Sequence, residues 1–286
     1  MVGVAKAGTT NLHSLLARHP QVFMSTPKEP HFLAAPQTTQ EAAHTLNVIR
    51  DESSYISLFA DAVEPIRGES STTNWWRPET AARIDAFSPG SRVIVILRDP
   101  VERAFSHYLN DVRESIESRP FGETLTDSRP GEGALRWGDP DIRIELGFYA
   151  DRLAAYRETF GDRLLVLFAD DLFADADAQM RAISEFLGLT RDSLISSSDH
   201  GTNAHRMPRG RLARRALRSP LIRAAGRRIV PSRVRQRAYE LLMHDVAKPR
   251  MDPRSRERLR RLYAADSAKL ESVLGCPPRW KASEAR

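Results

Sequence analysis

The chain has 286 residues, of which 41% are hydrophobic and 28% charged, and its formal net charge at pH 7 is +6. This length suits one large α/β domain or two small domains. The absence of a run of eighteen apolar residues excludes a membrane-spanning helix, and the opening residues do not have the pattern of a cleaved signal. One cysteine excludes an internal disulfide and indicates a reducing compartment; we expect Cys276 to be a small buried residue.

The opening stretch MVGVAKAGTTNLHSLL indicates a strand, a loop and a helix. VGVA is a short apolar run, and Leu12, Leu15 and Leu16 share one face of a helix that we expect over residues 10–18. Because the first strand is so short, we expect the natural start to lie upstream of Met1.

The next part of the chain predicts two short strands and two helices. TPKEPHFL contains two prolines around a Lys-Glu pair and is therefore expected to form a loop. In chain order we expect a strand over 21–24, this loop, a helix over 40–63, a strand that ends at Glu69, and a helix over 78–87.

RVIVIL is a continuous β-branched run between turn residues, which is typical of a buried central strand in a parallel sheet. The helix that follows begins with a strong start signal. Asp99 can cap it, Pro100 stands at its first position, and Glu102 is placed to complete the capping arrangement.

Residues 114–143 are rich in Gly, Pro and Ser, and we expect a long excursion there on the substrate side. The alternation of strands and helices along the chain favours a doubly wound, mostly parallel α/β sheet in a single domain over residues 1–286. The elements predicted for the second half are helices over 148–160, 176–187 and 253–274 and a strand over 164–168.

The opening loop almost matches the phosphate-binding pattern G-x-x-x-x-G-K-[ST]. Gly3, Gly8 and Thr10 have the right spacing, but Thr9 stands where the lysine belongs, and Lys6 lies on the other side of the glycine. Without that lysine a triphosphate loses its main counter-charge, whereas backbone amides at a helix N-terminus still hold one phosphate. The loop therefore suits a 5′-phosphate that carries one further transferable group.

Three motifs together resemble one family. KAGTTNL resembles the PKSGTT loop of sulfotransferases that use 3′-phosphoadenosine 5′-phosphosulfate (PAPS), and KEPHFL resembles a segment of their heparan-sulfate-type and bacterial members. VIVILRDPVERAFSHY is similar to their 3′-phosphate motif. The three motifs occur in the family's order, although Ala5 and Ala7 stand where the family often has Pro and Ser. The resemblance implies the P-loop-like sulfotransferase fold.

The resemblance also implies roles for individual residues. Lys6 would stabilise the charge that grows on the leaving phosphate oxygen. Arg98 and Ser106 would bind the 3′-phosphate, since arginine grips phosphate with a planar fork. The residues expected to contact the nucleotide are Lys6, Ala7, Gly8, Thr9, Thr10, Asn11, Arg98, Ser106, Arg209 and Gly210.

Glu29 is the candidate for the base that removes the acceptor's proton, as the glutamate of this segment does in heparan-type relatives. Glu69 is the second candidate, although its carboxylate can instead bind the hydroxyls of the neighbouring GESSTT segment. Lys28 either assists the sulfuryl oxygens or only flanks Glu29. His31 is more often a structural histidine, and the Trp75–Trp76 pair more often core than acceptor pocket.

Residues 203–237 contain twelve arginines and no acid. This segment has three open interpretations: a solvated face, a site for an acidic acceptor, or a peripheral contact with an anionic membrane. A basic block of this kind also fits a nucleic-acid-binding protein, but that reading leaves the three motifs unexplained, so we expect no nucleic-acid partner.

We therefore predict a cytoplasmic enzyme, with possible contact at the inner membrane face, that transfers a sulfuryl group from PAPS to a hydroxyl or an amine. The acceptor is open among carbohydrates, glycolipids and small natural products, and we expect no metal. The alternative enzyme is a small-molecule kinase that uses ATP, which the misplaced lysine disfavours.

Overall fold

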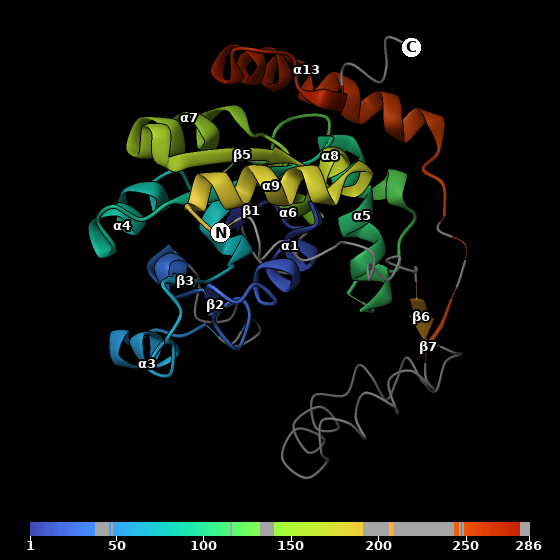
Figure 1. Cartoon of the computed structure of the whole chain (residues 1–286). Coiled ribbons are helices and arrows are strands. Elements are labelled where there is room, and N and C mark those ends of the chain that lie inside the picture. The colour runs from blue at the N-terminus through green and yellow to red at the C-terminus, as the bar shows by residue number, and fades with distance from the viewer. Residues whose placement is uncertain are drawn as a thin grey trace.

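Figure 1 shows the fold of the chain in a computed structural model. It describes residues 1–37, 46, 48–114, 116–131, 140–190, 206–208, 243–245, 247 and 249–280. Arg209 and Gly210, and all of the arginine-rich segment except residues 206–208, lie outside these ranges.

The strands form one three-stranded and two two-stranded sheets. The central sheet has the order β1-β4-β5 and is parallel throughout, with Val2 opposite Val95 and Ile96 opposite Leu167. β2 and β3 form a second parallel pair, and β6 and β7 an antiparallel pair. The strands are β1 (Val2–Gly3), β2 (Val22–Met24), β3 (Ile66–Gly68), β4 (Val93–Leu97), β5 (Leu164–Phe168), β6 (Arg206–Pro208) and β7 (Met243–Asp245).

Helices connect these strands and cover the sheet. The α-helices are α1 (Thr9–Leu16), α3 (Glu52–Ser57), α4 (Thr80–Phe87), α5 (Pro100–Arg113), α6 (Pro140–Glu145), α7 (Ala150–Phe160), α8 (Ala169–Ala174), α9 (Ala176–Leu187) and α13 (Pro253–Leu274). Short 3₁₀ segments are η1 (Phe32–Gln37), η2 (Thr72–Trp75), η3 (Phe121–Thr124) and η5 (Gly161–Arg163). α13 packs on the outside of α7, and α7 also contacts α4 and β5 (Figure 1).

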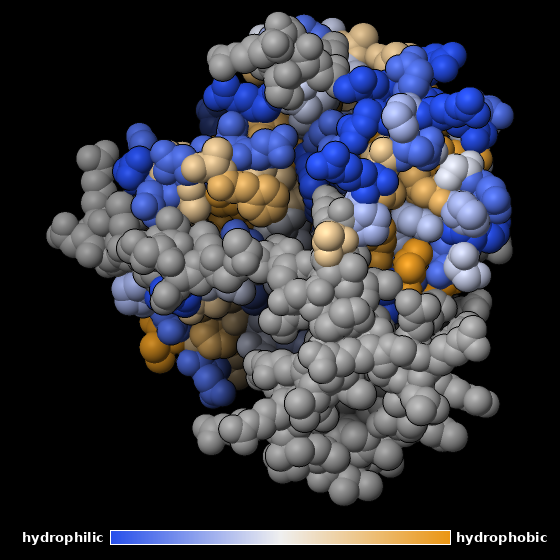
Figure 2. Space-filling view, turned by 90° about the vertical axis from the view of Figure 1, so that its right-hand side faces the viewer, coloured by the Kyte–Doolittle hydropathy of each residue, from blue (hydrophilic) through white to orange (hydrophobic). Residues whose placement is uncertain are grey.

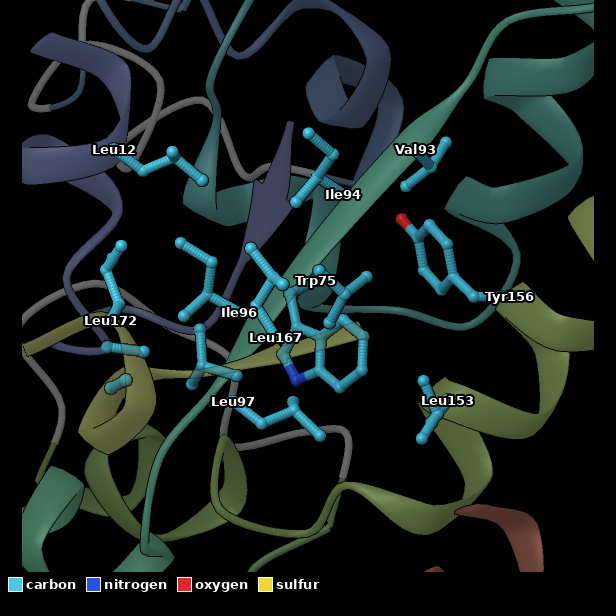
Figure 3. Packing of buried hydrophobic residues seen from close by; sticks show 14 of the residues in the cluster. Leu12, Trp75, Val93, Ile94, Ile96, Leu97, Leu153, Tyr156, Leu167 and Leu172 are labelled. Atoms are coloured by element: carbon cyan, nitrogen blue, oxygen red, sulfur yellow. The ribbon is translucent and has the colours of Figure 1, made fainter. Parts of the chain in front are cut away.

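The core lies on both faces of β4, whose five side chains are all buried. Figure 3 shows Leu12 of α1 and Leu172 of α8 on one side of this strand, and Leu153 and Tyr156 of α7 on the other. A strand covered on both faces needs a continuous apolar run, and VIVIL supplies it. The doubly wound, mostly parallel α/β sheet predicted from the sequence is confirmed.

The start of α5 agrees with its sequence signals in part. The Asp99 carboxylate accepts a hydrogen bond of 2.8 Å from the backbone N–H of Val101, and Pro100 opens the helix. Glu102, expected to complete the cap, instead pairs with Arg256 of α13 at 2.6 Å. The glutamate therefore joins two helices.

Two predicted elements need correction. Of the helix expected over 40–63, residues 40–45 and 47 lie outside the described ranges; in the described part residue 46 is helical, residues 48–51 are not, and α3 covers Glu52–Ser57, begins at an Asp51 cap and is followed by turns. The excursion expected over 114–143 ends in α6, which starts at Pro140. Neither segment has a long apolar stripe, so capping and tertiary contacts set where its helix begins and ends.

Cys276 is also placed differently from the prediction, because it is exposed. It directly follows Gly275, which ends α13 in the left-handed conformation.

Most of the described surface on the side of α5 and α13 is hydrophilic, with small hydrophobic patches (Figure 2). The exposed large hydrophobic residues of the described chain are Ile56, Val63, Phe87, Ile116 and Phe173. Among the described residues, every helix is too short or too polar to cross a membrane.

A buried ion cluster fastens α6 to α7. The fully buried Glu145 carboxylate pairs with Arg129 at 2.8 Å and with Arg152 of α7 at 3.1 Å. Arg152 also donates to the backbone oxygens of Trp76 and Phe148 at 3.1 and 2.6 Å. These ion pairs and hydrogen bonds tie Arg129 and α6 to α7.

We predict that Glu145→Gln lowers the free energy of unfolding by about 3–5 kcal/mol, because it leaves the buried Arg152 guanidinium without its counter-charge. Urea unfolding followed by circular dichroism measures this. The matched control is Glu257→Gln, which breaks an exposed pair with Arg261 on α13 and should cost under about 1 kcal/mol. Equal losses for the two variants would contradict a structural role for the cluster.

Candidate active site

The loop between β1 and α1 is shaped by two glycines. Gly8 caps α1 with φ 91°, and the helix start receives no side-chain cap. A Cβ on Gly8 would lie 3.2 Å from the Phe173 ring of α8, and one on Gly3 only 2.4 Å from Thr9 Cγ2. The first turn of α1 therefore keeps backbone N–H groups for an anion, as at other helix N-termini.

The other predicted loop residues occupy the same turn. The Ala7 N–H donates to the Val4 oxygen at 3.1 Å, and the Asn11 N–H to the Gly8 oxygen at 3.0 Å. Thr9 is buried and Thr10 is exposed at the start of the helix. The strand, loop and helix expected from the sequence are thus present, with Gly8 in the left-handed region that favours glycine.

Lys6 is held from two sides. Its backbone oxygen accepts a hydrogen bond of 3.0 Å from the Arg98 guanidinium at the end of β4. Its ammonium donates to Asn110 Oδ1 of α5, also at 3.0 Å. Burial, and next the positive charge of Arg113, lower the pKa of Lys6 to about 8.

Arg98 and Ser106 lie at the end of β4 and on the facing helix α5, as the sequence predicted. The Arg98 Nε is buried and has no hydrogen-bond partner among the described residues. No carboxylate of the described chain forms an ion pair with this guanidinium, whose hydrogen bond goes to backbone. The Tyr149 hydroxyl fixes the backbone here by donating to the Arg98 oxygen at 2.9 Å.

Glu29 is partly exposed and held by three neighbours. One carboxylate oxygen lies 2.5 Å from the Lys28 ammonium. The other accepts from the Thr72 hydroxyl at 3.1 Å and lies 3.6 Å from His31 Nε2. This carboxylate is oriented, but at 29% side-chain exposure it is still open to a ligand.

Glu69 has a different environment from Glu29. It is buried, and its two oxygens accept from the Ser71 hydroxyl and the Asn74 amide, both at 2.7 Å. Burial raises the pKa of Glu69. Both oxygens are engaged in ordering the segment after β3, which supports the structural alternative for this residue.

His31 is buried on the same segment. Its backbone N–H donates to Ser71 Oγ at 3.0 Å, and its Nδ1 lies 2.8 Å from Thr73 Oγ1. Burial lowers the pKa of His31, so the ring is neutral at pH 7. The ring packs with hydroxyl partners on one edge and faces the Glu29 carboxylate with the other.

Backbone strain coincides with the candidate residues. Among the described residues, the non-glycine residues with positive φ are Lys6 at 73°, Glu29 at 62° and His31 at 59°. Such conformations are costly for residues with a Cβ and tend to occur at functional sites. Lys6 and Glu29 were chosen from the sequence as site residues, whereas His31 was expected to be structural.

The structure adds His13 of α1, which the sequence analysis did not single out. Its Nδ1 lies 2.9 Å from the Ser70 hydroxyl. Burial and then the charge of Lys28 lower the pKa of His13 to about 4. The signal in the sequence was its position one helical turn after Thr9, which puts it beside the loop.

The remaining candidates are placed as follows. Trp75 and Trp76 are buried in the core, where Trp75 stacks on Tyr156, which agrees with the core alternative. Arg209 and Gly210 lie outside the described residues. In the described part of the chain no three metal-ligating side chains gather, and the expectation of a metal-free enzyme stays a prediction.

The candidate site comprises two groups. The first is the N-terminus of α1 with a lysine of lowered pKa and an arginine with an unpartnered N–H. The second is a partly exposed, oriented carboxylate. The first group can bind an anion and stabilise charge on it, and the second can accept a proton.

Comparison with known proteins decides the family. The chain matches the Sulfotransferase family over residues 38–193, which is more than half of its length. The chain belongs to this family. The match includes Arg98 and Ser106, whereas Lys6 and Glu29 precede it, so their assignment rests on the loop geometry and on the motifs.

Named relatives include mammalian sulfotransferases. The chain is 29% identical to heparan sulfate glucosamine 3-O-sulfotransferase 3A1 of Mus musculus over 195 residues, covering 67% of this chain and 45% of the relative. It is 24% identical to carbohydrate sulfotransferase 15 of Homo sapiens over 265 residues, covering 72% and 47%. The chain thus spans about half the length of these curated relatives.

A solved bacterial structure matches nearly the whole chain. It is a sulfotransferase from Alicyclobacillus acidocaldarius, with a TM-score of 0.73 and 25% sequence identity, covering 96% of this chain and 94% of that one. The P-loop-like sulfotransferase fold predicted from the motifs is confirmed.

Proposed function

We propose that this sulfotransferase moves a sulfuryl group from PAPS to a hydroxyl or amine of a carbohydrate, a glycolipid or a small natural product. One residue, Arg98, carries the choice of donor. Its Nε is buried and has no partner among the described residues, and the same guanidinium holds the Lys6 backbone beside the uncapped N-terminus of α1. A carbohydrate acceptor is supported by the relatives that act on heparan sulfate and other carbohydrates.

The residues present fit the donor better than they fit ATP. The first turn of α1 suits a single phosphate, because the lysine that follows Gly8 in an ATP loop is replaced by Thr9. Arg98 supplies a planar fork for a second phosphate, with Ser106 on the facing helix. Two separate anion sites fit a nucleotide with phosphates at both 5′ and 3′ positions.

The reaction needs a proton acceptor and a stabilised leaving group. The acceptor's oxygen or nitrogen forms a bond to sulfur and gives its proton to Glu29. The bond from sulfur to the 5′-phosphate oxygen breaks, and its electron pair stays on that oxygen. Lys6 then stabilises the new charge from a fixed position, as do other preorganised donors.

Glu29 suits the role of base better than Glu69 does. Lys28 and Thr72 orient its carboxylate, and the neutral His31 ring faces it, yet the side chain stays partly exposed. Both oxygens of Glu69 are occupied by buried partners. Proton transfer requires a lone pair within reach of the acceptor, and Glu29 can offer one.

We also propose a reducing, cytoplasmic setting, which the single cysteine supports. The membrane contact expected for 203–237 remains a proposal on charge alone, since twelve arginines without an acid suit an anionic surface.

The first test is nucleotide selectivity. We predict that 3′-phosphoadenosine 5′-phosphate binds at least about 10- to 100-fold more tightly than ADP, because a charge-assisted contact to the 3′-phosphate contributes that much. Isothermal titration calorimetry measures both affinities. Arg98→Lys keeps the charge but loses the fork, and it should remove most of the selectivity. Equal affinity for the two nucleotides in the unmodified protein contradicts the proposed donor.

The second prediction concerns Lys6. Lys6→Ala should lower kcat by about 10²–10³, the usual loss for one transition-state donor, and should weaken nucleotide binding less. With a pKa of about 8, Lys6 is charged at lower pH and loses its charge as the pH rises, so kcat/KM should fall above about pH 8.

Two further variants control this measurement. Lys6→Arg stays charged and should lack the alkaline decline, whereas Lys269→Ala removes an exposed lysine of α13 and should leave turnover and pH profile unchanged. If turnover of Lys6→Ala stays within a few-fold of the unmodified enzyme, Lys6 is not catalytic.

The third prediction ranks the two glutamates. Glu29→Gln should lower kcat by about 10²–10⁴ and leave nucleotide affinity nearly intact, because the base faces the acceptor. Glu69→Gln should keep more activity but lose about 1–3 kcal/mol of stability, since it disturbs two buried hydrogen bonds. Activity per folded molecule, with thermal unfolding in parallel, separates the effects. The reverse ranking of activities would move the base to Glu69.

A further inference from the structure

Two cationic side chains converge on one amide oxygen of α5. Asn110 Oδ1 accepts a hydrogen bond of 3.0 Å from the Lys6 ammonium and one of 2.8 Å from the Arg113 guanidinium. Lys6 comes from the loop before α1, and Arg113 from the last turn of α5. The two donors fix which end of the Asn110 amide points at the lysine.

The neighbouring carboxylate is turned to other partners. Asp111 is buried and lies 3.2 Å from the Arg143 guanidinium and 3.9 Å from His107 Nε2. Arg143 is also paired with Glu117 at 2.9 Å. The residue that directly contacts Lys6 is therefore a neutral amide, although an acid stands next to it in the chain.

We propose that Asn110 is a positioning residue, which holds the Lys6 ammonium at the phosphate loop without neutralising its charge. This inference rests on the proposed role of Lys6 in sulfuryl transfer. A carboxylate at the same place would pair with the ammonium and compete with the phosphate oxygen for it. An amide oxygen fixes the direction of the lysine and leaves its charge for the anion.

The helix gives Asn110 a rigid base close to the nucleotide site. Asn110 lies four residues after Ser106, so the two side chains share one face of α5. Asp99 caps the helix, and Arg103 in its buried face donates to the Arg143 oxygen. One helix thus carries both the residue assigned to the 3′-phosphate and the residue that directs Lys6.

The charges around Lys6 determine whether a substitution of Asn110 raises or lowers the pKa of Lys6. Arg98 and Arg113 disfavour the charged lysine, Asp111 and Glu114 favour it, and burial is the largest influence. His107 on the same helix is buried and neutral beside Arg103 and Arg143. Adding a carboxylate in direct contact should raise the pKa of Lys6, whereas removing the amide should not.

The test uses the whole chain labelled with ¹³C-lysine. Its lysines are Lys6, Lys28, Lys248, Lys269 and Lys281, so few Cε signals appear in the spectrum. Lys6→Arg identifies the Lys6 signal by its loss. We expect Asn110→Asp to raise the pKa of Lys6 by about one unit or more and Asn110→Ala to leave it unchanged or lower.

Turnover gives the second readout. Both substitutions should lower kcat by about 10- to 100-fold at pH 7, the equivalent of one charge-assisted hydrogen bond, with affinity for 3′-phosphoadenosine 5′-phosphate within a few-fold. Asn110→Asp should also shift the alkaline decline of kcat/KM upward. The control Glu102→Gln changes a charge two helical turns away on α5. It should alter neither the pKa of Lys6 nor kcat.

An unchanged Lys6 pKa in Asn110→Asp, or turnover of both Asn110 variants equal to that of Glu102→Gln, overturns the proposal. These outcomes differ from failure of the proposed function. If Lys6→Ala keeps full turnover, the catalytic role of Lys6 fails, while the pKa measurement still reports whether Asn110 holds the lysine.

Discussion

The hydrogen bond from the Arg98 guanidinium to the Lys6 carbonyl oxygen joins the end of β4 to the loop before α1. It holds a lysine with positive φ at the edge of the sheet where the strands end. The buried strand β4 places Arg98, and α5 directly after it places the side chain that receives the lysine's ammonium. The site thus lies where strand β4 ends. Ligand sites in open α/β sheets usually lie at the carboxyl ends of the strands.

Much of this arrangement follows from the sequence, because the signals are local. The apolar run VIVIL specifies a strand buried on both faces, and the Asp99-Pro100 start specifies the helix after it. The glycine at position 8 indicates a left-handed turn before α1. α9 and α13 begin and end where periodicity and capping residues placed them. Family motifs suggested the roles proposed for Lys6 and Glu29, which composition and spacing could not suggest.

Other features could not be settled from the sequence. A hydroxyl of the GESSTT segment was foreseen as one partner of Glu69, but only the folded chain shows that Asn74 takes the other oxygen while Glu29 stays partly exposed. The contact of His13 with Ser70, which lies 57 residues away in the chain, is visible only in the folded protein. α6 is too short to be predicted from periodicity, yet its Glu145 is paired with arginines from two other segments.

The lowered pKa of Lys6 has a chemical consequence outside sulfuryl transfer. With a pKa of about 8, about a tenth of the molecules carry a free amine at position 6 at pH 7, whereas for an ordinary lysine the fraction is below about one in a thousand. The chain has only four other lysines against 38 arginines. An amine-selective acylating reagent that carries a phosphate-like group should therefore prefer Lys6 to an ordinary lysine, which makes the loop before α1 a suitable target for covalent probes and inhibitors.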